Sequence, residues 1–210
     1  MHLEALTNNT KKAWEKCGFL QGYYLAGGTA LAFQIGHRKS IDLNFFSATP
    51  IKKILLKTFE EKFGGIITPL VKTTEELTLN VGGVKITCLH YPFPLLEPTI
   101  PTGVIPLADI RDIAAMKAYT IGRRQSFKDY VDLYILLSQG AVKLKNIIAD
   151  TQKVYGEAFN DRLFLEQLLY TDDLDDENID WIGTPVSKNK MQKWFKELIE
   201  KEIGGSDTQN

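Results

Sequence analysis

The chain has 210 residues, of which 44% are hydrophobic and 24% are charged, and its formal net charge is −1 at pH 7. This length suffices for one good hydrophobic core, or for a small domain with a helical extension. The near-zero net charge excludes an overall basic field that would draw the protein onto nucleic acid or an anionic membrane, but it leaves room for a local basic groove.

The two cysteines, Cys17 and Cys88, form no CxxC motif and have no metal-ligand spacing. Two isolated thiols without a signal peptide are typical of a reduced, cytoplasmic protein. No run approaches the roughly 18 apolar residues that a membrane-spanning helix needs. We therefore expect a cytoplasmic location and no membrane partner.

The first half of the chain alternates short helices and strands. Helices are expected at 3–17, ended by Gly18, at 29–35 and at 50–63, and strands at 23–26, 41–46, 66–72, 76–81 and 84–90. Gly27-Gly28 is predicted to form a tight turn before the helix at Thr29, and Gly82-Gly83 to form a hairpin turn.

The second half is predicted to be helical. A proline-rich connector near residues 91–106 precedes helices at about 107–121, 126–138, 143–155, 161–170 and 188–202, with an acidic loop at 172–177 and a frayed tail after Gly204. Strands followed by helices predict an α+β fold with a helical C-terminal half.

Asp42 and Asn44 are two residues apart in a predicted strand, so their side chains project from one face, while Ile41, Leu43 and Phe45 take the core side. Two carboxylates at this spacing can hold Mg²⁺ ions that bridge phosphate oxygens. Here the second position is an amide, which can ligate Mg²⁺ but carries no charge. A DxN pair by itself is also common at protein surfaces.

Gly27-Gly28 allows a close backbone approach to a ligand, and the free N–H groups of a helix opening at Thr29 attract phosphate. A plain helix start with Thr29 as its N-cap explains the same residues. His37, beside two basic residues, is expected to support phosphate or substrate binding rather than a metal.

In the helix predicted at 107–121, Lys117 falls on the apolar stripe, where its ammonium needs a partner or a ligand unless it reaches the solvent. Asp129, three residues after Ser126, has the spacing of a capping box. Asp132 lies one turn later on a helix that is apolar nearly all round, so it requires a cationic partner. The local candidates are Lys117, Arg123, Arg124 and Lys128.

Several segments together resemble the AbiEii-type nucleotidyltransferases, the toxins of type IV toxin–antitoxin (abortive infection) systems within the DNA polymerase β-like superfamily. The resemblance covers roughly residues 20–140. Its motifs are YLAGGTALA from Tyr24, GHRKSIDLNFFS from Gly36, DIRDIAAMK from Asp109, Arg123, and KDYVDLY from Lys128. Asn44 departs from the family pattern, which usually has Asp at that position.

The resemblance implies a polymerase β-like sheet with flanking helices over residues 1–100, and a helical region over 101–210 that packs on this core and completes the site. It implies an NTP substrate, Mg²⁺ or Mn²⁺ on Asp42 and Asn44, and an RNA acceptor such as tRNA. Lys117 would contact phosphate, and Asp129, or less favourably Asp132, would orient it or assist deprotonation. The nucleotide-binding residues would be Gly27, Gly28, Thr29, His37, Arg38 and Ser40.

Three hypotheses follow. The first is a metal-dependent nucleotidyltransferase that acts as a toxin. The second is a weakened relative, which keeps the fold and binds nucleotide or a protein partner, because Asn44 replaces a charged ligand. The third is a component that binds an antitoxin protein through its helical half, with the acidic loop at 172–177 as its only indication.

Overall fold

The computed structural model describes residues 1–65, 67–124, 126–171, 174 and 178–204. It divides into two compact units, Met1–Asp109 and Ile110–Asn210. Each unit is described by itself. The acidic loop expected at 172–177 lies outside the described residues apart from Leu174, and so does the expected tail after Gly204.

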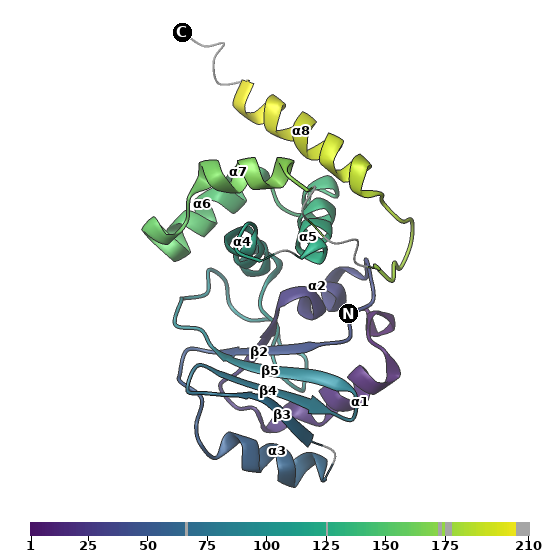
Figure 1. The fold of residues 1–210 in the computed structure, drawn as a ribbon, viewed down its shortest axis with the longest axis vertical. Coiled ribbons are helices and arrows are strands. Elements are labelled where there is room, and N and C mark those ends of the chain that lie inside the picture. The colour runs from purple at the N-terminus through teal and green to yellow at the C-terminus, as the bar shows by residue number, and fades with distance from the viewer. Residues whose placement is uncertain (66, 125, 172–173, 175–177, 205–210) are drawn as a thin grey trace. The chain divides into compact units, whose positions relative to one another are not determined.

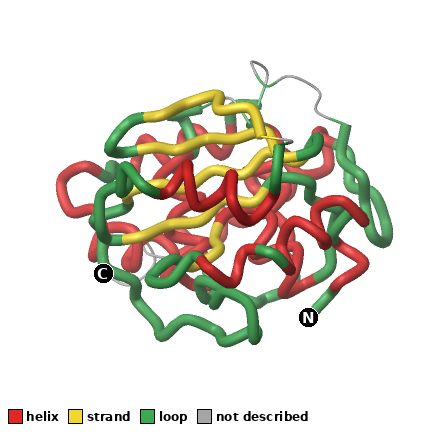
Figure 2. The backbone as a smooth tube through the Cα atoms, turned by 90° about the horizontal axis from the view of Figure 1, so that it is seen from below, coloured by secondary structure: helices red, strands yellow, loops and turns green. Residues whose placement is uncertain are grey.

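The first unit contains one five-stranded sheet. Its strands are β1 (Tyr24–Ala26), β2 (Leu43–Ser47), β3 (Ile67–Lys72), β4 (Glu76–Val81) and β5 (Val84–His90). The strand order is β1-β2-β5-β4-β3. Figure 1 labels β2, β5, β4 and β3 in this order, and Figure 2 shows the strands in yellow. Only β2 and β5 run parallel, and the other neighbours pair antiparallel. The described residues of this unit also form α1 (Asn8–Glu15), α2 (Gly27–Ile35) and α3 (Leu55–Phe63).

Buried and half-buried side chains alternate along β2, which explains its place in the sheet. Leu43 and Phe45 are fully buried, and Trp14 of α1 stacks on Phe45 with ring centroids 6.2 Å apart. Asn44 and Phe46 are half-buried, as expected for the opposite face of a strand. The expectation for Ile41 is wrong, because its side chain is 58% exposed and the strand begins only at Leu43.

The N-terminal segment forms a broken helix rather than the continuous one expected over 3–17. A 3₁₀ turn at Leu3–Ala5 is followed by extended backbone at Leu6, and a second 3₁₀ turn, Cys17–Phe19, follows α1. The break occurs because the Thr7 side chain caps α1 by accepting a hydrogen bond from the Thr10 N–H at 3.2 Å. The freed backbone bonds elsewhere, and Ser40 N–H donates to the Ala5 carbonyl at 2.8 Å.

The segment after β5 returns to the sheet edge beside β1. Leu25 N–H donates to the Pro106 carbonyl at 2.9 Å, and Ala108 N–H donates to the Leu25 carbonyl at 2.8 Å. The backbone of β1 is therefore hydrogen-bonded on both sides, which fixes the strand that leads into Gly27.

The second unit consists of helices α4 (Ile110–Thr120), α5 (Phe127–Ser138), α6 (Leu144–Tyr155), α7 (Asp161–Leu169) and α8 (Lys188–Gly204), with a 3₁₀ turn at Gly156–Ala158. All but one of the α5 residues from Phe127 to Leu137 are buried, as its apolar sequence predicts. Arg111 of α4 makes a bidentate ion pair with Asp150 of α6, with N–O distances of 2.5 and 2.7 Å.

The predicted fold class is confirmed, since a mixed sheet with flanking helices precedes a helical C-terminal half. Within the described residues, no helix is both long and apolar enough to cross a membrane.

Candidate functional site

The turn between β1 and α2 lies directly against Asn44. Gly27 has φ +71°, a conformation that favours glycine, and a Cβ built at this position would lie 3.7 Å from Asn44 Nδ2. The register explains this proximity, because Ala26 and Asn44 are direct partners in the β1–β2 pair. The predicted glycine turn and the predicted polar strand are therefore neighbours.

Thr29 connects the first turn of α2 to the loop before β2. Its hydroxyl lies 2.7 Å from Ser40 Oγ and donates to the backbone carbonyl of Asp42. A threonine hydroxyl has one proton, so Ser40 donates to Thr29 while Thr29 donates to Asp42. Thr29 is only 1% exposed. These bonds hold Ser40 and Asp42 beside the start of α2.

This role differs from the one expected for Thr29. Helix α2 begins at Gly27 with Ala26 as its N-cap, so Thr29 stands inside the first turn and is not the capping residue. Its side chain bonds across 11 to 13 residues of sequence to the loop, instead of bonding to its own helix. The side chain of Thr29 therefore makes tertiary hydrogen bonds instead of the local capping bond, and its nucleotide-binding role stays a prediction.

Asp42 and Asn44 are both half-buried. Carboxylate and amide oxygens are hard donors of the kind that Mg²⁺ prefers, and Mg²⁺ keeps several waters and is commonly held by one or two carboxylates plus substrate phosphates. The donor set therefore fits a magnesium ion shared with a phosphate ligand, with one negative charge from the protein. Among the described residues, no group of three His, Cys, Asp or Glu side chains could hold a metal by itself.

His37 and Arg38 are more buried than a surface phosphate site requires, at 5% and 3% exposure. Arg38 Nη1 donates to the Lys39 carbonyl at 3.2 Å. Ser40, at 9% exposure, bonds to Thr29. A phosphate-binding role for His37, Arg38 and Ser40 stays a prediction.

The second unit brings Lys117, Asp129 and Asp132 into one cluster. Lys117 Nζ lies 2.5 Å from Asp129 Oδ1 and 2.6 Å from Asp132 Oδ2. The three side chains are 5%, 2% and 0% exposed. An ammonium has three N–H donors, and these two contacts use two of them. The reading in which Lys117 reaches the solvent is wrong, because its charge is neutralised inside the unit.

Arg124 completes the cluster from the surface. Its Nε and Nη2 lie 2.6 and 2.9 Å from the two carboxylate oxygens of Asp129, while 59% of the arginine side chain is exposed. The capping box expected at Ser126 is not formed, since the Ser126 side chain makes no cap hydrogen bond. Arg123 does not pair with these aspartates and instead places its guanidinium over the Tyr119 ring at 4.1 Å.

The two cations determine the charge state of Asp129. Burial by itself raises the pKa of this carboxyl, but the Lys117 ammonium and the Arg124 guanidinium beside it hold its pKa below the ordinary value. Asp129 is therefore an ionised hydrogen-bond acceptor at neutral pH. A general base would need to exchange a proton near neutral pH, and this environment opposes that.

One set of polar residues near this site was missed from the sequence. Thr87 of β5 is the direct partner of Asn44, and Thr78 of β4 is the direct partner of Thr87. Threonines in strands are common, so only the register between distant strands identifies them.

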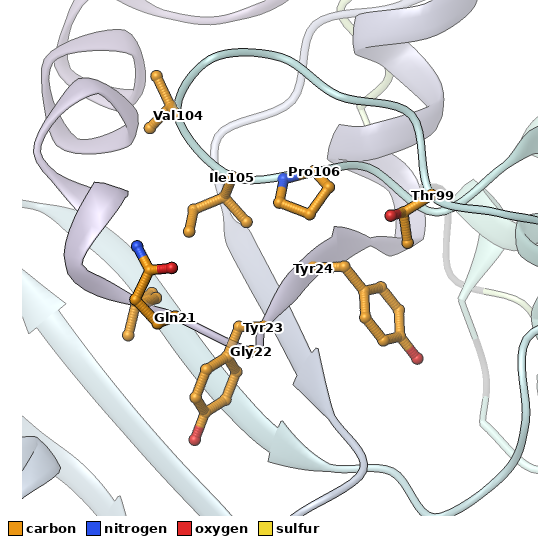
Figure 3. A pocket seen from close by; sticks show the side chains of 9 residues that line it. Gln21, Gly22, Tyr23, Tyr24, Thr99, Val104, Ile105 and Pro106 are labelled. Carbon is orange, nitrogen blue, oxygen red and sulfur yellow. The ribbon is translucent and has the colours of Figure 1, made fainter.

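A cavity of about 320 Å³ lies at the opposite end of β1 from Gly27. Figure 3 shows Tyr23 and Tyr24 side by side along it, with Ile105 and Pro106 across from them. None of the predicted site residues lines it. Its lining residues are Leu20, Gln21, Gly22, Tyr23, Tyr24, Thr99, Val104, Ile105 and Pro106.

Comparison with known proteins identifies a family model and a related sequence. A family model described as nucleotidyl transferase AbiEii toxin, type IV toxin–antitoxin system, matches residues 14–207. A protein of Aquifex aeolicus (strain VF5), described as uncharacterized, is 30% identical over 183 residues, which span 83% of this chain and 87% of the relative.

Two solved structures are similar in fold. MenT4, a nucleotidyltransferase toxin from Mycobacterium tuberculosis H37Rv, matches with a TM-score of 0.59 and 18% identity over 89% of this chain and 80% of that chain. JHP933 from Helicobacter pylori matches with a TM-score of 0.55 and 17% identity over 98% of this chain and 100% of that chain.

Proposed function

Since the chain belongs to the AbiEii family of nucleotidyltransferase toxins of type IV toxin–antitoxin systems, we propose that it transfers a nucleotide from an NTP to an RNA acceptor with a divalent metal, Mg²⁺ or Mn²⁺, on Asp42 and Asn44. The family gives the enzyme class, nucleotidyltransferase, and the toxin role. The metal, the acceptor and the residues that act are the parts that we propose.

The observation that supports this proposal most strongly is the cluster of Thr29, Ser40 and Asp42. Its hydrogen bonds join the start of α2 to the loop before β2, so Asp42 lies beside a helix N-terminus whose free N–H groups attract phosphate. The positive φ of Gly27 places the turn backbone against Asn44 on the other side. These observations support the proposal that N–H donors for phosphate and oxygen ligands for the metal lie in the same part of the first unit.

In this site the protein acts by positioning. The backbone of Gly27 and Gly28 would approach the triphosphate, and the N–H groups of the α2 first turn would bind its oxygens. Asp42 and Asn44 would hold the metal through their side-chain oxygens. A bound Mg²⁺ would neutralise and orient the phosphate oxygens of the NTP.

We propose separate roles for Lys117 and Asp129, namely phosphate binding for the lysine and orientation of the lysine for the aspartate. Asp129 and Asp132 accept two of the three N–H groups of Lys117 and so orient its ammonium. We propose that the third N–H donates to a phosphate oxygen. Because Asp129 is held ionised, we assign it to orienting Lys117 rather than to deprotonating the acceptor.

The test uses the purified full chain with total tRNA and each of the four labelled NTPs, in Mg²⁺ and separately in Mn²⁺. We expect label to enter the RNA with at least one NTP. Asp42→Asn should lower the rate by about a hundredfold or more, the scale of losing one preorganised charged group. Glu61→Gln, in an exposed ion pair with Lys57 on α3, serves as the matched control and should leave the rate unchanged. Absence of transfer with all four NTPs would contradict the proposal that RNA is the acceptor.

A weakened enzyme is the second candidate, and Asn44 is the observation that favours it. Asn44→Asp restores the charge that family members usually carry at this position. A large gain in rate indicates that the natural chain is a weak catalyst, whereas an unchanged rate indicates that Asp42 and Asn44 suffice. Binding of Mg²⁺–NTP without transfer in either protein supports a nucleotide-binding role.

A further inference from the structure

Polar side chains cross three adjacent strands beside Asn44. Strand register aligns Asn44 of β2 with Thr87 of β5, and Thr87 with Thr78 of β4 (strands labelled in Figure 1). Direct partners in neighbouring strands point to the same face of a sheet and lie about 5 Å apart. Glu76, two residues before Thr78 in β4, shares that face. We call Asn44, Thr87, Thr78 and Glu76 the polar row.

Hydrogen bonds connect the outer three members of this polar row. Thr78 Oγ1 lies 2.5 Å from Glu76 Oε1 and 3.1 Å from Thr87 Oγ1. A hydroxyl has one proton, and an ionised carboxylate can only accept. Thr78 is the donor in both contacts, so its single proton is shared between the Glu76 carboxylate and the Thr87 oxygen.

The middle of the polar row is shielded from water. Thr78 is 2% exposed and Thr87 is 6% exposed, whereas Glu76 and Asn44, at its two ends, are half-buried. Hydrogen bonds in such surroundings polarise one another, and charges are screened less than at the surface. The negative charge of Glu76 therefore acts along Thr78 and Thr87 toward Asn44.

We propose that Glu76 is a positioning residue for the metal: through Thr78 and Thr87 it supplies the negative charge that Asn44 lacks. The charge of Glu76 would act on a bound metal through the buried contact of Thr78 with Thr87, where water screens it little. This inference rests on the proposed function, because it needs a metal at Asp42 and Asn44. Glu76 lies on β4, a strand that carries none of the site residues predicted from motifs.

The experiment measures Mn²⁺ affinity by electron paramagnetic resonance, with a non-hydrolysable NTP analogue present, in the full-length protein. Glu76→Gln keeps an acceptor for Thr78 and removes only the charge. We expect it to weaken Mn²⁺ binding about tenfold, as loss of an outer partner of a metal site commonly does. Glu75→Gln is the matched control: it removes an adjacent carboxylate that is 66% exposed and pairs with His90. Its Mn²⁺ affinity should equal that of the wild type.

A second pair of variants separates this role from a structural one. In an Asn44→Asp background the site carries its own second charge, so Glu76→Gln should change Mn²⁺ affinity less than about twofold, and the two substitutions are non-additive. Thr78→Val cuts the connection and should weaken binding as much as Glu76→Gln. An equal loss from Glu76→Gln in both backgrounds overturns the proposal.

Failure of this inference and failure of the proposed function give different results. If the wild-type protein binds Mn²⁺ with the analogue and Glu76→Gln binds equally well, only the role of Glu76 is overturned. If the wild-type protein binds no Mn²⁺ at all, while its urea unfolding shows it to be folded, the metal site on Asp42 and Asn44 is overturned, and the role of Glu76 with it.

Discussion

Lys117 and Asp129 form an ion pair removed from water, with Nζ 2.5 Å from Oδ1 and with only 5% and 2% of the two side chains exposed. Asp132 contacts the same ammonium at 2.6 Å. Charges in such surroundings lose their hydration, so they are tolerated only when each has its partners. The stability of the second unit is therefore tied to Lys117, which we assign to phosphate binding, and to Asp129, which we assign to orienting Lys117.

Lys117→Met should destabilise the protein by about 3–5 kcal/mol, because it leaves two buried carboxylates without their shared cation. Urea unfolding followed by circular dichroism measures the loss. Adding Asp129→Asn and Asp132→Asn to the same chain removes the uncompensated charges and should recover part of it. A loss below about 1 kcal/mol for Lys117→Met would show that water reaches this cluster.

Acid should weaken the fold through Asp129. Its pKa is lowered in the folded protein, so below roughly pH 4 the unfolded chain binds a proton that the folded chain does not. The stabilising contribution is complete above the unfolded pKa and is lost as pH falls through the folded pKa. Asp129→Asn removes it, so the free energy of unfolding should fall less steeply between about pH 5 and pH 3 than in the wild type. Identical slopes would contradict this prediction.

Thr29→Val removes the hydroxyl that connects Ser40 with the Asp42 carbonyl. Because both partners then lose a bond next to a side chain with 1% exposure, we expect a loss of about 1–3 kcal/mol. Thr29→Ser keeps the hydroxyl and is the control, with a smaller loss. Calorimetric titration with Mg²⁺–NTP should show weaker binding for Thr29→Val only. Unchanged affinity would separate this cluster from the nucleotide site.

Gly27→Ala should cost about 1–2 kcal/mol because its φ of +71° disfavours a side chain. Space is not the reason, since the new Cβ would make only an ordinary contact, at 3.7 Å, with Asn44 Nδ2. Gly65→Ala is the control: φ is not in the left-handed region there and nothing lies within 4 Å of its Cβ. Thermal unfolding compares the two, and equal melting temperatures would mean that the turn relaxes.

Much of the local structure could be read from the sequence. Strands β3, β4 and β5 lie within a residue of the predicted ranges, and Gly82 and Gly83 form the expected turn with positive φ. Apolar alternation and turn glycines act over a few residues, so one sequence carries them. The motifs around Gly27, Asp42 and Lys117 likewise indicated the family that the comparison confirmed.

The partners of the site residues were decided by the tertiary structure. The sequence predicted Thr29 as a helix cap and Asp129 as part of a capping box. In the structure both side chains form hydrogen bonds with residues at least five positions away. Local spacing cannot distinguish these outcomes, because a side chain forms whichever bond the register and helix packing bring within reach.

The sequence alone determined the order of strands and helices, the enzyme family and the residue types of the proposed site. These depend on short-range patterns. The tertiary structure alone decided that Asp129 is held ionised between Lys117 and Arg124 and that Glu76 shares a sheet face with Asn44. Both are consequences of burial and strand register, which bring together residues that are far apart in the chain.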